Sequence, residues 1–102
     1  MHHIKTDMLV QLMGCYFHQD WLEEFPDDLA ALHAIVEEVP KEQIIEGLVE
    51  IENLRNAGLH EDELSAILVD RIGCYFAPDS QGLSYGQWLH RVRNVFADAV
   101  AS

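Results

Sequence analysis

Apolar residues recur every three or four positions along almost the whole chain, which is the spacing of an amphipathic α-helix. Proline, glycine and capping residues divide this pattern into segments. The expected elements are helices that begin at residue 6 or 7, at 26, at 40 and at 60, a short turn at 20–25, a loop at 77–82, and a last helix capped by Ser84. No alternating strand pattern of useful length is present. The prediction is an all-α, single-domain bundle of about five helices.

Each expected helix has an apolar stripe that should face the core. In chain order, these side chains are Leu9, Leu12, Met13 and Tyr16; Leu29, Leu32, Ile35, Val36 and Val39; Ile44, Ile45, Leu48, Ile51 and Leu54; Leu64, Ile67, Leu68 and Ile72; and Trp88, Leu89, Val92, Val95 and Phe96. The fourth helix is expected to continue to residue 75.

The tetrapeptide GCYF occurs twice, at residues 14–17 and 73–76, and each copy ends a predicted helix. A disulfide between the two cysteines would need an oxidising compartment. A metal site is disfavoured because Ala77 stands where the first copy has His18. The favoured interpretation is two similar helix ends that pack beside each other, each with a glycine that admits another helix and a Tyr-Phe pair that fills the bundle end.

Acidic residues outnumber basic ones by 18 to 6, which gives this chain of 102 residues a formal net charge of −12. A surface of that sign repels phosphate backbones and anionic membranes and suits a basic protein partner. The apolar runs are far shorter than the about 18–20 residues that cross a bilayer, and no convincing signal peptide precedes them. We expect one cytoplasmic domain over residues 1–102 with reduced thiols. The sequence leaves the oligomeric state and the origin of His2 and His3 open.

No enzyme signature is present: there is no Gly-rich phosphate loop, no G-x-S-x-G, no H-E-x-x-H and no paired-cysteine zinc motif. We therefore predict no catalytic residue, no cofactor and no metal ligand. A Cys–His nucleophile is disfavoured because both cysteines lie among aromatic residues, where Cys behaves as a small apolar side chain. Helix-turn-helix DNA binding is rejected because the last helix offers only Arg91 and Arg93 to phosphates.

The acids are distributed unevenly, since residues 20–54 contain eleven acidic residues and one basic residue, Lys41. Several are placed where they do not favour a helix, either four residues apart or at a helix C-terminus. A solubilising surface is one explanation, and a basic partner is the other. The residues predicted to bind the partner are Glu42, Glu46 and Glu50, with Glu37 and Glu38 beside them, and then the cluster Glu23, Glu24, Asp27 and Asp28.

The string YFHQDW at residues 16–21 resembles the opening motif of one group of contact-dependent growth inhibition immunity proteins. Later parts of the chain are similar to the same pattern, so the resemblance spans roughly residues 8–96. These parts are Glu50-x-Glu52-x-Leu54 followed by Gly58 and an acidic helix start, and GCYF at 73–76 with Pro78, Gly82 and Ser84 to Trp88-Leu89.

The resemblance implies a small cytoplasmic protein, not an enzyme, that binds and neutralises the toxic C-terminal domain of a large exported effector. Such toxins are often nucleases, whose basic clefts would suit an acidic helical body. The motif residues are assigned to the fold: Tyr16, Phe17, Trp21, Tyr75, Phe76 and Trp88 as packing side chains, and His18 and Asp20 as residues that fasten a turn. The alternative function is an acidic adaptor or dimerisation module that binds another basic protein.

Overall fold

A computed structural model describes residues 4–101, so His2 and His3 lie outside the described part. Over this range the chain forms no strand and five helices of seven residues or more, when α1 with η1 and α5 with η2 are each counted as one continuous helix, which confirms the predicted all-α fold. The elements in order are α1 (Asp7–Leu9), η1 (Val10–Gly14), α2 (Trp21–Glu24), α3 (Asp28–Glu38), α4 (Lys41–Asn56), α5 (Glu61–Ala66), η2 (Ile67–Ile72), η3 (Pro78–Gln81) and α6 (Tyr85–Ala101). α1 runs directly into η1, and α5 into η2.

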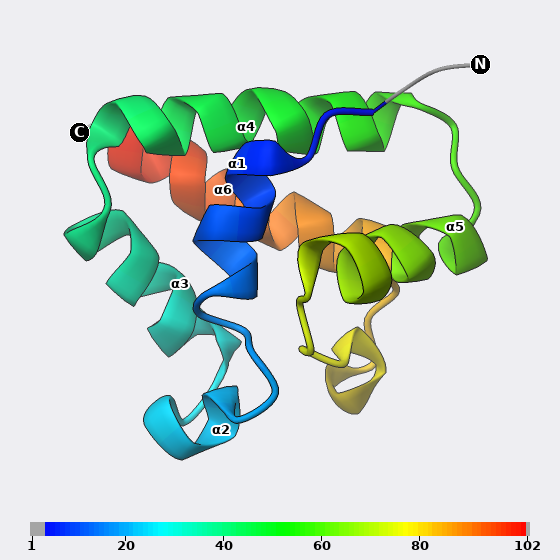
Figure 1. Cartoon of the computed structure of the whole chain (residues 1–102), viewed down its shortest axis with the longest axis horizontal. Helices are drawn as coiled ribbons and strands as arrows, with labels where there is room; N and C mark the ends of the chain where they lie inside the picture. Colours follow the sequence, from blue (N-terminus) through cyan, green and yellow to red (C-terminus); the bar gives the residue numbers. More distant parts are fainter. Residues whose placement is uncertain (1–3, 102) are drawn as a thin grey trace.

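The long helices α4 and α6 pack along each other, and the shorter helices pack against this pair (Figure 1). α1 contacts α4, whereas α3 and α5 both contact α6. The apolar stripes of all these helices meet in one buried cluster. Leu12, Leu32, Ile51 and Phe96 lie at its centre with almost no exposed surface.

The helix starts lie within two residues of the expected positions. The Asp27 carboxylate accepts a hydrogen bond from the Ala30 backbone N–H at 2.8 Å and caps α3. Pro40 occupies the N-cap position of α4. At α5 the Glu63 side chain accepts from the His60 backbone N–H at 3.1 Å, as in a capping box.

Two details of the expected core are wrong. Leu29 and Ile45 do not face inward but remain 40% and 46% exposed. The fourth helix ends at Ile72 rather than at residue 75, because Gly73 adopts a left-handed conformation with φ of 80°. Cys74 therefore lies in the segment after the helix.

The two GCYF copies do pack beside each other, but their glycines have different roles. The first copy begins at Gly14, the last residue of the π-helical turn η1, and the second copy follows the π-helical turn η2. The two turns are in contact. A Cβ on Gly14 would lie 2.4 Å from the Ile72 carbonyl oxygen, so this glycine permits the close approach. Gly73 has open space where a Cβ would be, and its left-handed backbone is what requires glycine. The Tyr75 N–H then donates to the Phe17 carbonyl at 2.8 Å and joins the two ends.

Candidate partner-binding surface

The two glutamates at the N-terminal half of α4 lie on the surface. Glu42 and Glu46 are exposed and one helical turn apart. Glu37 and Glu38 end α3, immediately before the turn into α4, and both are also exposed. Glu38 accepts a hydrogen bond from the Tyr16 hydroxyl at 2.8 Å. Burial, together with this bond and the carboxylate charge, raises the pKa of Tyr16 to about 12.

Glu50 differs from the sequence-based expectation, because it does not share an exposed face with Glu42 and Glu46. Its side chain is only 4% exposed. The carboxylate accepts hydrogen bonds from the backbone N–H groups of Leu9, at 2.9 Å, and Met8, at 3.2 Å. These groups belong to the first turn of α1, which has no side-chain cap of its own. Glu50 therefore acts as a cap supplied by another helix.

Asp28 is also buried, at 1% exposure, and not part of an exposed acidic cluster. Its carboxylate accepts from Trp88 Nε1 at 2.8 Å, Gln81 Nε2 at 2.8 Å and Arg91 Nη1 at 3.0 Å. Burial disfavours the charged form, but these three bonds and the guanidinium charge outweigh it and lower the pKa of Asp28. The carboxylate thus connects α3, η3 and α6.

The other acids of the second cluster remain at the surface around α2. Glu23, Glu24 and Asp27 are all exposed. Glu24 contacts His18 Nε2, and His18 Nδ1 accepts from the Asp20 backbone N–H at 3.1 Å. The turn is therefore held by the His18 side chain and by the backbone of Asp20, whose own side chain makes no cap bond.

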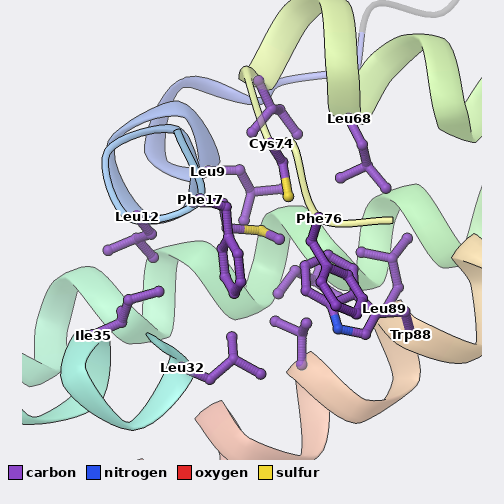
Figure 2. Packing of buried hydrophobic residues seen from close by; sticks show 14 of the residues in the cluster. Leu9, Leu12, Phe17, Leu32, Ile35, Leu68, Cys74, Phe76, Trp88 and Leu89 are labelled. Atoms are coloured by element: carbon purple, nitrogen blue, oxygen red, sulfur yellow. The ribbon is translucent and has the colours of Figure 1, made fainter. Parts of the chain in front are cut away.

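Four motif aromatics form a continuous aromatic stack, in which Phe17 meets both tryptophans edge to face. Phe17 lies 5.3 Å from both Trp21 and Trp88, measured between ring centroids, and Phe76 lies 4.6 Å from Trp88 and 5.7 Å from Trp21. Figure 2 shows Phe17, Phe76 and Trp88 pointing into the same core. The tyrosines of the two GCYF copies lie outside this stack, since Tyr16 is partly buried and Tyr75 is 51% exposed.

Arg91 lies beside the second acidic cluster, whereas Arg55 and Arg93 lie along the contact between α4 and α6. Arg55 and Arg93 both approach Glu52, at 2.9 and 3.6 Å, along the contact between α4 and α6. Arg91 binds Asp28, and Arg71 donates to the Ile4 carbonyl at 2.8 Å. Arg91 also donates to Gln81 Oε1 at 2.7 Å, so one guanidinium lies beside the acids around α2.

Neither a candidate metal-binding cluster nor a candidate membrane-spanning helix occurs in the described part of the chain. Within residues 4–101 no three His, Cys, Asp or Glu side chains are grouped so that they could hold a metal ion. Both cysteines are free thiols, Cys15 exposed and Cys74 buried. Over the same range, no helix combines the length and the apolar character that crossing a bilayer requires.

These features describe a small, acidic, all-α protein in which most of the carboxylates lie at the surface and two, Asp28 and Glu50, are buried. A family model described as CdiI immunity protein matches residues 5–96. The chain therefore belongs to the CdiI immunity protein family, which confirms the resemblance drawn from the YFHQDW motif. Membership indicates a toxin-neutralising immunity function, and proteins of this family are generally not enzymes. No curated protein and no solved structure matches the chain.

Proposed function

We propose that this chain binds the toxic C-terminal domain of a contact-dependent growth inhibition effector in the cytoplasm, and that this domain is a basic nuclease. The match to the immunity family over residues 5–96 is the observation that carries the proposal. The net charge of −12 supports the part concerning a basic partner.

The proposed inhibition follows from electrostatics. A nuclease must present Lys and Arg side chains to the phosphates of its substrate. An acidic protein surface competes for the same cationic cleft, and it also accelerates the encounter between the two proteins. Inhibition then needs no chemistry from the immunity protein, because occupying or covering the cleft is sufficient.

Two acidic surfaces are candidates for this contact. The first is formed by Glu42 and Glu46 with Glu37 and Glu38 at the adjoining end of α3. The second is formed around α2 by Glu23, Glu24 and Asp27. Glu50 and Asp28 support the fold beneath these surfaces, because both carboxylates are bonded inside the protein.

Calorimetric titration against the C-terminal domain of the exported protein encoded beside this chain tests the proposal. We would titrate at about 50 and 500 mM salt, which bracket weak and strong screening. Nanomolar binding that weakens with salt is expected. Tight binding indifferent to salt would keep the immunity function and refute its electrostatic part. No binding at either salt concentration would refute the cognate pairing and favour the adaptor function.

The charge-reversed double variant Glu42→Lys/Glu46→Lys tests the first surface. If that surface meets the toxin, association at low salt should slow by at least about tenfold, the scale on which electrostatic steering acts. The matched control is Asp62→Lys/Asp70→Lys, which changes the net charge equally on the exposed side of α5 and η2. Equal association rates for the two variants would show that Glu42 and Glu46 do not lie in the interface.

A further inference from the structure

An apolar groove of about 260 Å³ lies between α2 and the segment that carries η3. Trp21 and Phe76 line it and are nearly buried, with their ring centroids 5.7 Å apart. Leu22 on one side and Tyr75 on the other are 66% and 51% exposed. The groove therefore has a fixed aromatic floor and two large apolar side chains that reach into water.

Leu22 and Tyr75 have no role in the core that explains their apolar character. Isolated exposed apolar residues are common, but two that flank a groove in the same surface are typical of a protein-binding site. Tyrosine is one of the residues that most often carries the binding energy of an interface. The aromatic stack under the groove fixes the shape of the groove in the free protein. A partner therefore does not have to order these side chains, which lowers the entropic cost of binding.

The charge around the groove defines its occupant. The two segments that form it, residues 16–29 and 73–84, contain six acids and neither Lys nor Arg. Asp27 lines the groove itself, and no Lys or Arg does. Arg91 of α6 is the nearby cation: it is bonded to the buried Asp28 and donates to Gln81, a lining residue, at 2.7 Å. An apolar groove with an acidic surround is complementary to an apolar side chain flanked by Lys or Arg.

A second groove, between α4 and α6, is larger but lacks this complementarity. It measures about 320 Å³ and is lined by Ile45, Leu48 and Val49. Arg93 and Glu52 both line it and lie 3.6 Å apart, so its charge is mixed. A strongly basic partner gains less there than at α2.

We propose that the groove between α2 and η3 receives an apolar side chain from a basic surface of the toxin domain, and that this contact sets how long the complex lasts. The inference rests on the proposed immunity function and deepens it. The surrounding carboxylates would guide the toxin to this end of the bundle, while Leu22 and Tyr75 would bury apolar surface against it.

The double variant Leu22→Ser/Tyr75→Ala tests the groove against the same toxin domain used above. Affinity should fall by at least about 30-fold, as for interface residues that dominate binding, with most of the change in the dissociation rate. The matched control, Ile45→Ala/Val49→Ser, removes apolar side chains of similar exposure from the other groove and should change affinity less than about twofold. Far-UV circular dichroism of both variants would check that the fold is intact.

The outcomes separate this inference from the function on which it rests. If the wild type binds the toxin and the Leu22/Tyr75 variant binds equally well, the groove assignment is wrong and the immunity function stands. A loss confined to the control variant would move the site to the α4–α6 groove. Failure of the wild type to bind would overturn both proposals. Sedimentation of the protein alone should show a monomer, whereas a dimer that disappears in the Leu22/Tyr75 variant would assign the groove to a second copy.

Discussion

Substitution of Glu50 by alanine is expected to destabilise the fold far more than substitution of Glu46, one turn earlier on the same helix. The Glu50 carboxylate accepts backbone N–H bonds from Met8 and Leu9, and the bond to Leu9 is buried. Alanine leaves both donors of the first turn of α1 without this acceptor. Because both substitutions replace Glu by Ala in α4, their helix propensities cancel and the difference reports the bonds.

The size of the effect follows from those two bonds. A hydrogen bond that involves a charged group contributes about 1.5–3 kcal/mol. Two of them, one partly exposed, give a loss of about 3 kcal/mol for Glu50→Ala, whereas exposed Glu46→Ala should stay within about 0.5 kcal/mol. In a domain of this size, 3 kcal/mol corresponds to a fall in melting temperature of about 12–24 °C. Glu50→Gln keeps one acceptor oxygen and should fall between these two variants.

Urea denaturation followed by circular dichroism at 222 nm measures these differences. Amide hydrogen exchange of Met8 and Leu9 gives an independent reading, because loss of the cap should accelerate exchange at these two positions before it affects α6. If Glu50→Ala and Glu46→Ala unfold at the same urea concentration, the interhelical cap does not stabilise the protein and the assignment of Glu50 to the fold is wrong.

Two further predictions concern buried titratable groups. Asp28→Asn should lower stability at neutral pH. Because the folded pKa of Asp28 lies below its ordinary 3.8, the difference from wild type should be complete above pH 3.8 and shrink as the pH falls through that lower folded value. Urea midpoints at several pH values check this, and a constant difference down to acid pH would contradict it. Burial raises the pKa of the Cys74 thiol to about 12, while Cys15 is exposed. A thiol reagent at neutral pH should therefore modify one cysteine in the folded protein and two in urea. The variant Cys15→Ser should abolish the reaction of the folded protein. Rapid modification of both cysteines in the folded protein would show that Cys74 is not buried.

The hydrophobic period was sufficient to predict the number and order of the five longer helices, because each presents a regular apolar stripe to one core. It did not predict the short helices α2 and η3, which lie where a turn and a loop were expected. It was less accurate for the ends of helices and for the residues at the edge of an apolar stripe, such as Leu29 and Ile45. The fourth helix stops early because Gly73 takes a left-handed conformation, and a glycine inside an apolar pattern does not by itself distinguish a helix end from a close packing contact.

The acidic residues show where sequence spacing stops being informative. Residues four apart are rotated by about 40° on a helix, so Glu50 is turned about 80° from Glu42. That rotation is enough to move it from the surface to the contact with α1. Asp28 follows Asp27 directly, and its partner Trp88 is 60 residues away. No local signal tells which of the two aspartates caps the helix and which turns inward to a tryptophan.

The second GCYF segment connects the fold to the proposed binding surface, because it divides its aromatic side chains between the two. Phe17 and Phe76 enter the aromatic stack, and Phe76 forms part of the groove floor, whereas Tyr75 stands on the groove's rim. Loss of a floor residue should therefore cost stability and binding together, while loss of a rim residue should cost binding alone. Substitutions on the rim should therefore alter binding without disturbing the aromatic stack that holds the groove in place.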